Sequence, residues 1–210
     1  MLPNLPEIMS RRLERPLPGR RAMRPYEPEL SYGRHSDPPR PGARQAAVIA
    51  LLYPHSGEWH LPLILRPVHM SEHAGQVSFP GGMSEPGETS AAAGLRELSE
   101  ELGIEVENAR ILGRLSLLHL YSTNFAITPW IAWLPARPEM RPNPTEVAAV
   151  LEVPLAHLCD EANIGRHLLQ RGGLRFFAPH ISWHGHQIWG ATALILGELL
   201  AVVAEAEAGG

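Results

Sequence analysis

The sequence predicts an α/β sandwich, in which helices cover a β-sheet. A nearly continuous apolar run at residues 46–53 has the pattern of a strand that is covered on both faces. Other apolar segments of strand length alternate with helical segments at 90–102 and 191–204. Strands that alternate with helices over one sheet give this class of fold.

Residues 1–42 are rich in proline and arginine and form a separate stretch. Proline fixes φ and removes a hydrogen-bond donor, so we expect a short helix at most, followed by a wrapping arm or linker. The 210 residues suffice for one domain with a sizeable core plus an extension. We therefore divide the chain into an N-terminal arm at 1–42 and a compact domain at 43–205.

The first half of the domain alternates between regular segments and turns. The strand at 46–53 leads through a turn at 55–57 to a second strand at 60–66. Residues 74–89 are rich in glycine and proline, which predicts a loop with close backbone approaches. A helix at 90–102 should follow, and Gly103 is its expected C-terminal stop.

The second half contains several shorter segments. We expect strands at 109–121 and 124–134, a proline-rich loop at 135–144, a short helix near 154–159, strands at 174–177 and 187–189, and a final helix at 191–204. The segment Trp183-His184-Gly185-His186 is predicted to be a hairpin turn rather than a zinc site, because no cysteine lies nearby.

Composition excludes several classes of protein. Hydrophobic residues make up 44% and charged residues 19% of the chain, which is typical of a folded globular protein. The net charge of −4 argues against a nucleic-acid partner. The longest apolar run, 188–204, contains Glu198 and is too short to span a membrane. Cys159 is the only cysteine, so we expect a reducing compartment, the cytoplasm.

Three glutamates on the helix at 90–102 indicate chemistry. At about 100° per residue, Glu97 and Glu101 share one helix face, and Glu100 lies beside Glu97. Carboxylates this close repel one another, and a hard divalent cation such as Mg²⁺ or Mn²⁺ would relieve that repulsion. Glu88 can fold back toward the cluster, and Arg96 can brace it through a charge-assisted fork. The alternative is a solvated acidic helix face.

The spacing of these residues resembles the signature of the Nudix hydrolases, Gly-x5-Glu-x7-Arg-Glu-U-x-Glu-Glu-x-Gly-U, where U is apolar. Every fixed position matches, and the matching residues are Gly82, Glu88, Arg96, Glu97, Leu98, Glu100, Glu101, Gly103 and Ile104. The resemblance implies an α/β/α sandwich with a mixed sheet and a loop–helix–loop that binds Mg²⁺ or Mn²⁺. It also implies hydrolysis of a nucleoside diphosphate linked to another moiety, by attack of water on phosphorus.

The resemblance assigns expected roles to individual residues. Glu97 and Glu101 correspond to the principal metal ligands, Glu100 to a further ligand or the water activator, Glu88 to an accessory position and Arg96 to the brace. A backbone carbonyl of Gly81 or Gly82 is expected to complete the coordination.

Three further segments resemble the coenzyme A diphosphatase branch of the family. They are residues 63–66 followed by 73–82, residues 143–147 with 152–155, and residues 188–192. This likeness implies cleavage of CoA or acyl-CoA to 3′,5′-ADP and (acyl-)4′-phosphopantetheine. Ser71 and Pro67 depart from the branch pattern, which has an arginine and a serine or alanine there. ADP-ribose or a dinucleotide therefore stays open as the substrate, and so does a homodimer as the assembly.

Several residues outside the signature are candidates for the site. Arg66 is a candidate phosphate contact, or else a solvated arginine at a strand end. Glu146 is a second candidate general base, or else a helix-start glutamate. His73 and Phe79 are candidate substrate contacts, with loop and core roles as their alternatives. A catalytically silent ligand sensor of the same fold is disfavoured, because all the signature carboxylates are present.

Overall fold

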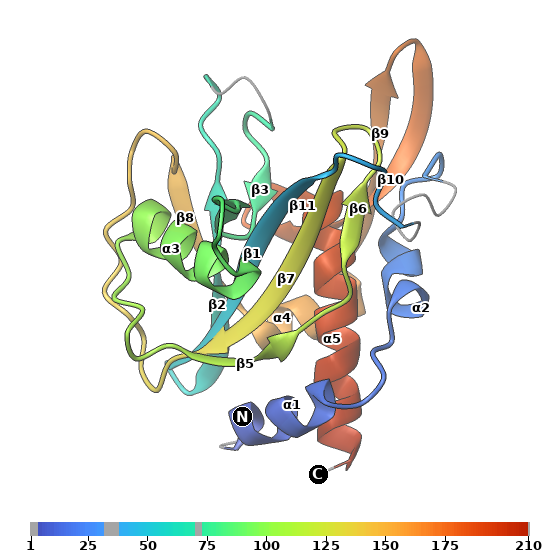
Figure 1. The fold of residues 1–210 in the computed structure, drawn as a ribbon. Helices are drawn as coiled ribbons and strands as arrows, with labels where there is room; N and C mark the ends of the chain where they lie inside the picture. The colour runs from blue at the N-terminus through green and yellow to red at the C-terminus, as the bar shows by residue number, and fades with distance from the viewer. Residues whose placement is uncertain (1–3, 32–37, 70–72, 210) are drawn as a thin grey trace.

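A mixed β-sheet forms the centre of the molecule (Figure 1). The computed structural model describes residues 4–31, 38–69 and 73–209. In the sheet, β1 (Arg44–His55) runs parallel to β7 (Phe125–Trp133), and the remaining pairs are antiparallel. The other strands are β2 (Glu58–Leu65), β3 (Val77–Ser78), β4 (Gly81–Met83), β5 (Arg110–Arg114), β6 (Leu118–Leu120) and β8 (Ala149–Pro154).

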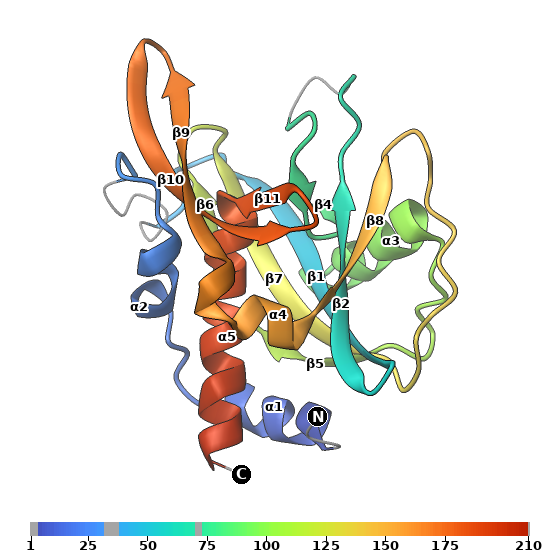
Figure 2. The same ribbon diagram turned by 180° about the vertical axis from the view of Figure 1, so that it is seen from behind.

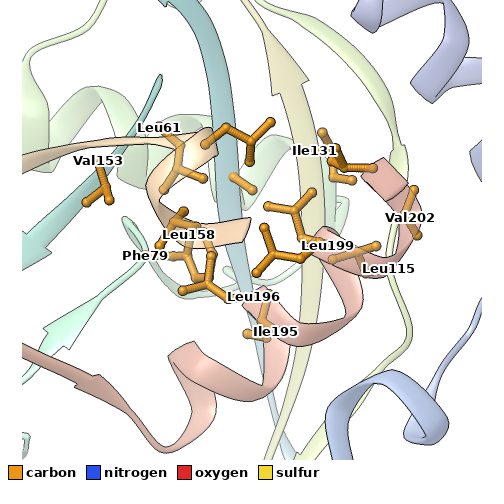
Figure 3. Close-up of a cluster of buried hydrophobic side chains, with 14 of the residues drawn as sticks. Leu61, Phe79, Leu115, Ile131, Val153, Leu158, Ile195, Leu196, Leu199 and Val202 are labelled. Atoms are coloured by element: carbon orange, nitrogen blue, oxygen red, sulfur yellow. The ribbon is translucent and has the colours of Figure 1, made fainter. Parts of the chain in front are cut away.

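Helices cover both faces of β1, as its apolar run predicted. On one face, Leu98 and Leu102 of α3 (Ser90–Leu102) pack with Ile49. On the other face, α5 (Ala191–Gly209) packs against residues such as Leu52. Figures 1 and 2 show the two helices on opposite sides of the sheet, and Figure 3 shows the α5 side chains meeting the sheet and α4 (Leu155–Cys159). The predicted α/β sandwich with a mixed sheet is confirmed.

Helix α3 begins and ends where the sequence predicts. The Thr89 hydroxyl accepts a hydrogen bond from the Ala92 N–H at 3.2 Å and caps the first turn. Gly103 ends the helix with φ of 63°, in the left-handed region that favours glycine. A Cβ at Gly94 would lie 2.7 Å from Ile49 Cδ1, so this glycine lets the helix approach β1 closely.

The first 31 residues hold more regular structure than the proline content predicted. Helix α1 (Leu5–Leu13), helix α2 (Arg20–Met23) and a 3-10 helix (Arg24–Tyr26) pack along α5. Pro6 and Pro25 lie in first turns, where a missing N–H costs no helical hydrogen bond. Leu5, Met9, Met23 and Tyr26 are buried. The division of the chain at residue 42 stays a prediction.

A second, three-stranded sheet stands beside the first. It consists of β9 (Ile164–Arg171), β10 (Leu174–Trp183) and β11 (His186–Trp189). The predicted hairpin turn is confirmed, because Trp183 pairs with His186 and both His184 and Gly185 have positive φ. Among the described residues, no helix is long and apolar enough to cross a membrane.

The sequence missed four strands. β3 and β4 lie inside the segment predicted as a loop, and they are only two and three residues long. β9 is rich in polar residues, and β8 lies where no element was expected. The expected strand at 109–121 is divided into β5 and β6, and α5 continues to Gly209 beyond the expected end at 204.

Candidate active site

The loop before α3 lies directly against the two glutamates on the helix face. The Gly81 N–H donates a hydrogen bond to Glu101 Oε2 at 2.9 Å. A Cβ at Gly82 would lie only 2.4 Å from the Glu97 carboxyl carbon. β4 holds this loop in place, since Gly82 pairs with Ala47 of β1. The backbone at Gly81 and Gly82 therefore touches both carboxylates, and the lack of a side chain at Gly82 makes room for Glu97.

Arg96 holds four oxygen-bearing groups together. Its Nε and Nη2 donate to the two carboxylate oxygens of Glu88 at 3.1 and 3.3 Å. Its Nη1 donates to Glu97 Oε1 at 2.9 Å and to Glu100 Oε2 at 3.0 Å. Its Nη2 also donates to the Met83 carbonyl oxygen at 3.0 Å. The arginine thus fixes the loop relative to the helix.

The electrostatics of the glutamates differ sharply. Burial raises the pKa of Glu101 to about 8, and repulsion from Glu97 and Glu146 adds to the rise. Burial also raises the pKa of Glu97, against the opposing effect of Arg96. The hydrogen bonds from Arg96 lower the pKa of Glu88. Negative charge is thus disfavoured at Glu101 unless a further cation joins it.

The donor set fits a hard divalent cation. Glu97, Glu101 and Glu146 interact electrostatically and supply only carboxylate oxygens, which Mg²⁺ and Mn²⁺ prefer. Within residues 4–31, 38–69 and 73–209, no three acidic, histidine or cysteine side chains already converge as a metal site. One Glu97 oxygen instead accepts from Arg96. The fit therefore rests on the chemistry of the donors and on the repulsion that a cation would relieve.

A cavity of about 620 Å³ adjoins this cluster. Gly81 and Gly82 line one part of it, and α5, β10 and β11 contribute Ile195, Phe176 and Trp189 elsewhere. Arg66 also lines it, and the positive charge of Arg66 favours the ionised form of Glu101. The Arg66 Nε is buried and has no hydrogen-bond partner among the described residues. The cavity is thus a binding space beside the carboxylates.

The structure gathers most of the residues predicted from the sequence. Those that lie together in the loop, the helix and the adjoining wall are Gly81, Gly82, Glu88, Arg96, Glu97, Glu100, Glu101, Glu146 and Arg66. Glu100 is the most exposed of the helix glutamates, at 57% for its side chain.

Two predicted substrate contacts have other partners. His73 is exposed at the cavity, and its Nδ1 lies 2.9 Å from Gln76 Oε1, a hydrogen bond within the loop. Phe79 is 3% exposed and belongs to the core, although it also lines the cavity. Ser71, which departs from the branch pattern, lies outside the described residues.

Sequence reasoning missed much of the cavity wall. Pro28, Leu30 and Ser31 line it, although they belong to the segment expected to be an arm or linker. The β6–β7 turn adds residues 121–123. Thr192 of α5 lies in the segment 188–192 that the sequence did indicate, and its hydroxyl donates a hydrogen bond to the Val77 carbonyl at 2.9 Å. No local motif marks residues 28–31, since only the tertiary fold brings them to the cavity.

The fold is an α/β/α sandwich, and its candidate site is a loop and a helix that carry carboxylates. Together they define the class of protein as a hydrolase that cleaves diphosphates. Residues 43–171 match the NUDIX domain, and the chain belongs to the Nudix family. It is a Nudix hydrolase, a pyrophosphohydrolase.

Two relatives are each described as an uncharacterized Nudix hydrolase, NudL. The protein from Photorhabdus laumondii is 35% identical over 140 residues, which is 66% of this chain and 74% of the relative. The protein from Yersinia pestis is 33% identical over 151 residues, which is 66% of this chain and 75% of the relative.

Solved structures agree on the fold. The Nudix hydrolase RenU from M. smegmatis has a TM-score of 0.51 at 18% identity, over 77% of this chain and 87% of that one. A MutT/nudix family protein from Enterococcus faecalis has a TM-score of 0.51 at 17% identity, over 82% of this chain and 67% of that one. At this identity, both likenesses bear on architecture alone.

Proposed function

We propose that the chain hydrolyses the diphosphate bond of CoA or acyl-CoA, giving 3′,5′-ADP and (acyl-)4′-phosphopantetheine. The observation that carries this proposal is that two segments far apart in the sequence lie side by side at the cavity. Residues 73–82 and 188–192 both resemble the coenzyme A diphosphatase branch, and both line the cavity beside the carboxylates. The hydrogen bond from Thr192 to Val77 joins them directly.

The cavity supports a substrate with a long, largely apolar portion. Its volume of about 620 Å³ lies within the range of small-molecule sites, which is about 300–1,000 Å³. Apolar side chains make up much of its wall, including Leu120, Phe125, Ile127 and Leu169. A pantetheine arm or a short acyl chain has the chemistry to bind such a wall, while Arg66 suits a phosphate group.

The residue roles follow from the contacts. Glu97 and Glu101 would hold Mg²⁺ or Mn²⁺ together with a carbonyl oxygen of Gly81 or Gly82. When bound, such an ion neutralises charge on the diphosphate and lowers the pKa of a water molecule. Arg96 positions Glu97, and Glu88 in turn orients Arg96.

Glu100 and Glu146 are the two candidates for the base that takes a proton from the attacking water. Arg96 already engages Glu100 Oε2. Within the described residues, no arginine donates a hydrogen bond to the Glu146 carboxylate. Glu146 also lies close enough to Glu97 and Glu101 to interact electrostatically with both. We therefore favour Glu146 as the base and keep Glu100 as the alternative.

A substrate panel tests the proposal. CoA, an acyl-CoA, ADP-ribose and a dinucleoside polyphosphate are each incubated with the enzyme and Mg²⁺ or Mn²⁺, and the products are identified by mass spectrometry. The expected result is the highest kcat/KM for CoA or acyl-CoA, with 3′,5′-ADP as a product. Equal or faster turnover of ADP-ribose would favour the other ADP-linked substrates, with which Ser71 and Pro67 are compatible.

A second measurement separates an enzyme from a silent sensor. Glu101→Gln should abolish turnover of every substrate in the panel, while thermal unfolding shows that the variant is folded. Unchanged turnover in this variant would contradict the assignment of Glu101 as a metal ligand.

A further inference from the structure

Two arginines are stacked on aromatic rings beside the cavity. The Arg40 guanidinium carbon lies 3.3 Å from the centroid of the Tyr121 ring, and that of Arg44 lies 3.9 Å from the centroid of Phe125. Arg44 Nη2 also donates to the Thr123 carbonyl oxygen at 3.2 Å. Tyr121, Thr123 and Phe125 all line the cavity. Neither arginine lines the cavity itself, but both guanidinium groups contact residues of its wall at the rim.

The strand register places Arg44 at the end of β1 on the cavity side. Side chains alternate between the faces of a strand, so Arg44 shares a face with Ala46 and Val48, which both line the cavity. Ala47 pairs with Gly82 of the signature loop. Arg44 is three residues from Ala47, or about 10 Å along the strand.

Within the described part of the chain, no carboxylate neutralises the positive charges of these two arginines by an ion pair. Among the described residues, neither Arg40 nor Arg44 forms an ion pair with a carboxylate, whereas Arg12, Arg96 and Arg137 each do. Of the described residues that line the cavity, none is aspartate or glutamate. Stacking fixes each guanidinium plane and leaves N–H donors at its edge. Such a pair of cations is suited to a phosphate group.

We propose that Arg40 and Arg44 form a recognition site for a phosphate monoester on the substrate, separate from the diphosphate that is cleaved. This inference rests on the proposed function, because the group in question is the 3′-phosphate on the ribose of CoA. ADP-ribose carries no phosphate at that position. The two arginines thus select 3′-phosphorylated substrates.

The test compares CoA with dephospho-CoA, which differs only by the 3′-phosphate. Wild-type enzyme, Arg40→Gln and Arg44→Gln are each assayed with both substrates under steady-state conditions. We expect kcat/KM for CoA to fall about tenfold in each variant, the size expected for one lost charge-assisted hydrogen bond. The fall should come mainly from KM, since the contact is the same before and during the reaction. The kcat/KM for dephospho-CoA should not change.

Two control variants separate charge recognition from a structural effect. Arg44→Lys keeps the positive charge and should recover part of the lost kcat/KM for CoA. Arg114→Gln removes an exposed arginine of β5 that, unlike Arg40 and Arg44, stacks on no ring that the structure describes in the cavity wall, and it should leave both substrates unaffected. Thermal unfolding of each variant checks that it is folded.

The outcomes distinguish this site from the proposed function. If the wild-type enzyme cleaves CoA but the variants lose activity equally on both substrates, or lose none, the arginine site is overturned and the proposed function stands. If the wild-type enzyme leaves CoA intact, the proposed function is overturned together with the site. A loss confined to CoA supports both.

Discussion

The Glu97 carboxylate lies so close to the Gly82 backbone that a Cβ at position 82 would sit 2.4 Å from the carboxyl carbon. Gly82 has no positive φ, so its need for glycine comes from this contact and not from backbone conformation. The signature glycine and the signature glutamate therefore depend on each other through packing.

We expect Gly82→Ala to lower kcat by about 100-fold, because a displacement of about 1 Å at a reacting centre costs that much. The Glu97 side chain can turn away from the new methyl group, so the fold should persist. Steady-state kinetics and thermal unfolding measure the two effects. Ser84→Ala, a similarly small change in the same loop, is the control and should keep near wild-type kcat. Wild-type kcat in Gly82→Ala would show that Glu97 need not lie where it does.

The brace at Arg96 is tested by a substitution that keeps its charge. Lysine cannot reach Glu88, Glu97, Glu100 and the Met83 carbonyl together, since it lacks the planar fork of donors. We expect Arg96→Lys to lower kcat by about 10–100-fold and to raise the Mg²⁺ concentration for half-maximal activity. Arg141→Lys changes an exposed arginine paired with Glu139 and should alter neither. If the Arg96→Lys variant kept the wild-type dependence on Mg²⁺, the proposal that Arg96 positions the metal-binding carboxylates would be contradicted.

Glu198 joins the N-terminal segment to the core. Its buried carboxylate accepts hydrogen bonds from the N–H of Gly19 at 2.8 Å and from the N–H and hydroxyl of Ser116 at 2.8 and 2.6 Å. Glutamine has one acceptor oxygen fewer, so Glu198→Gln leaves a buried N–H facing an amide NH₂. We expect the free energy of unfolding to fall by about 2 kcal/mol.

Urea denaturation measures this loss. Glu205→Gln is the matched control on the same helix, because Glu205 is partly exposed and pairs with Arg12 and Arg21. It should cost less than about 1 kcal/mol. Equal losses in the two variants would mean that burial of Glu198 adds nothing to stability.

A pH dependence of stability follows from Glu152. Hydrogen bonds from Arg137, at 2.7 and 2.6 Å, and from the Tyr53 hydroxyl, at 2.8 Å, hold the pKa of Glu152 below its ordinary value. The stabilisation is present above the ordinary pKa of a glutamate and is lost as the pH falls through the lowered one. The stability advantage of the wild-type protein over Glu152→Gln should therefore shrink as the pH falls from about 5 to about 3. An advantage that stayed constant over this range would contradict the ion pair.

The parts of the fold that could be predicted are those with local causes. Helix α3 has its cap at Thr89 and its stop at Gly103 within its own sequence, and its bounds were predicted to the residue. The strand at β1 followed from one apolar run. β9 could not be found in this way, because Gly165, Arg166 and His167 have no apolar alternation and only pairing with β10 makes them a strand.

The same distinction between local and tertiary causes holds for the candidate site. Helical periodicity places Arg96, Glu97 and Glu101 near one another, so their proximity could be predicted from the sequence. The burial of Glu101, at 2% exposure, and the stacked arginines depend on segments that meet only in the folded chain. The same holds for Pro28 and Leu30, which reach the cavity from the N-terminal segment.

Anomalous diffraction from crystals grown in Mn²⁺ tests the central claim most directly. We predict a manganese peak within coordination distance of both the Glu97 and Glu101 carboxylates, beside the Gly81–Gly82 backbone. Crystals of Glu101→Gln in the same solution should show a weaker peak or none. A wild-type map with no peak at this helix face, in crystals that hold ample Mn²⁺, would contradict the account.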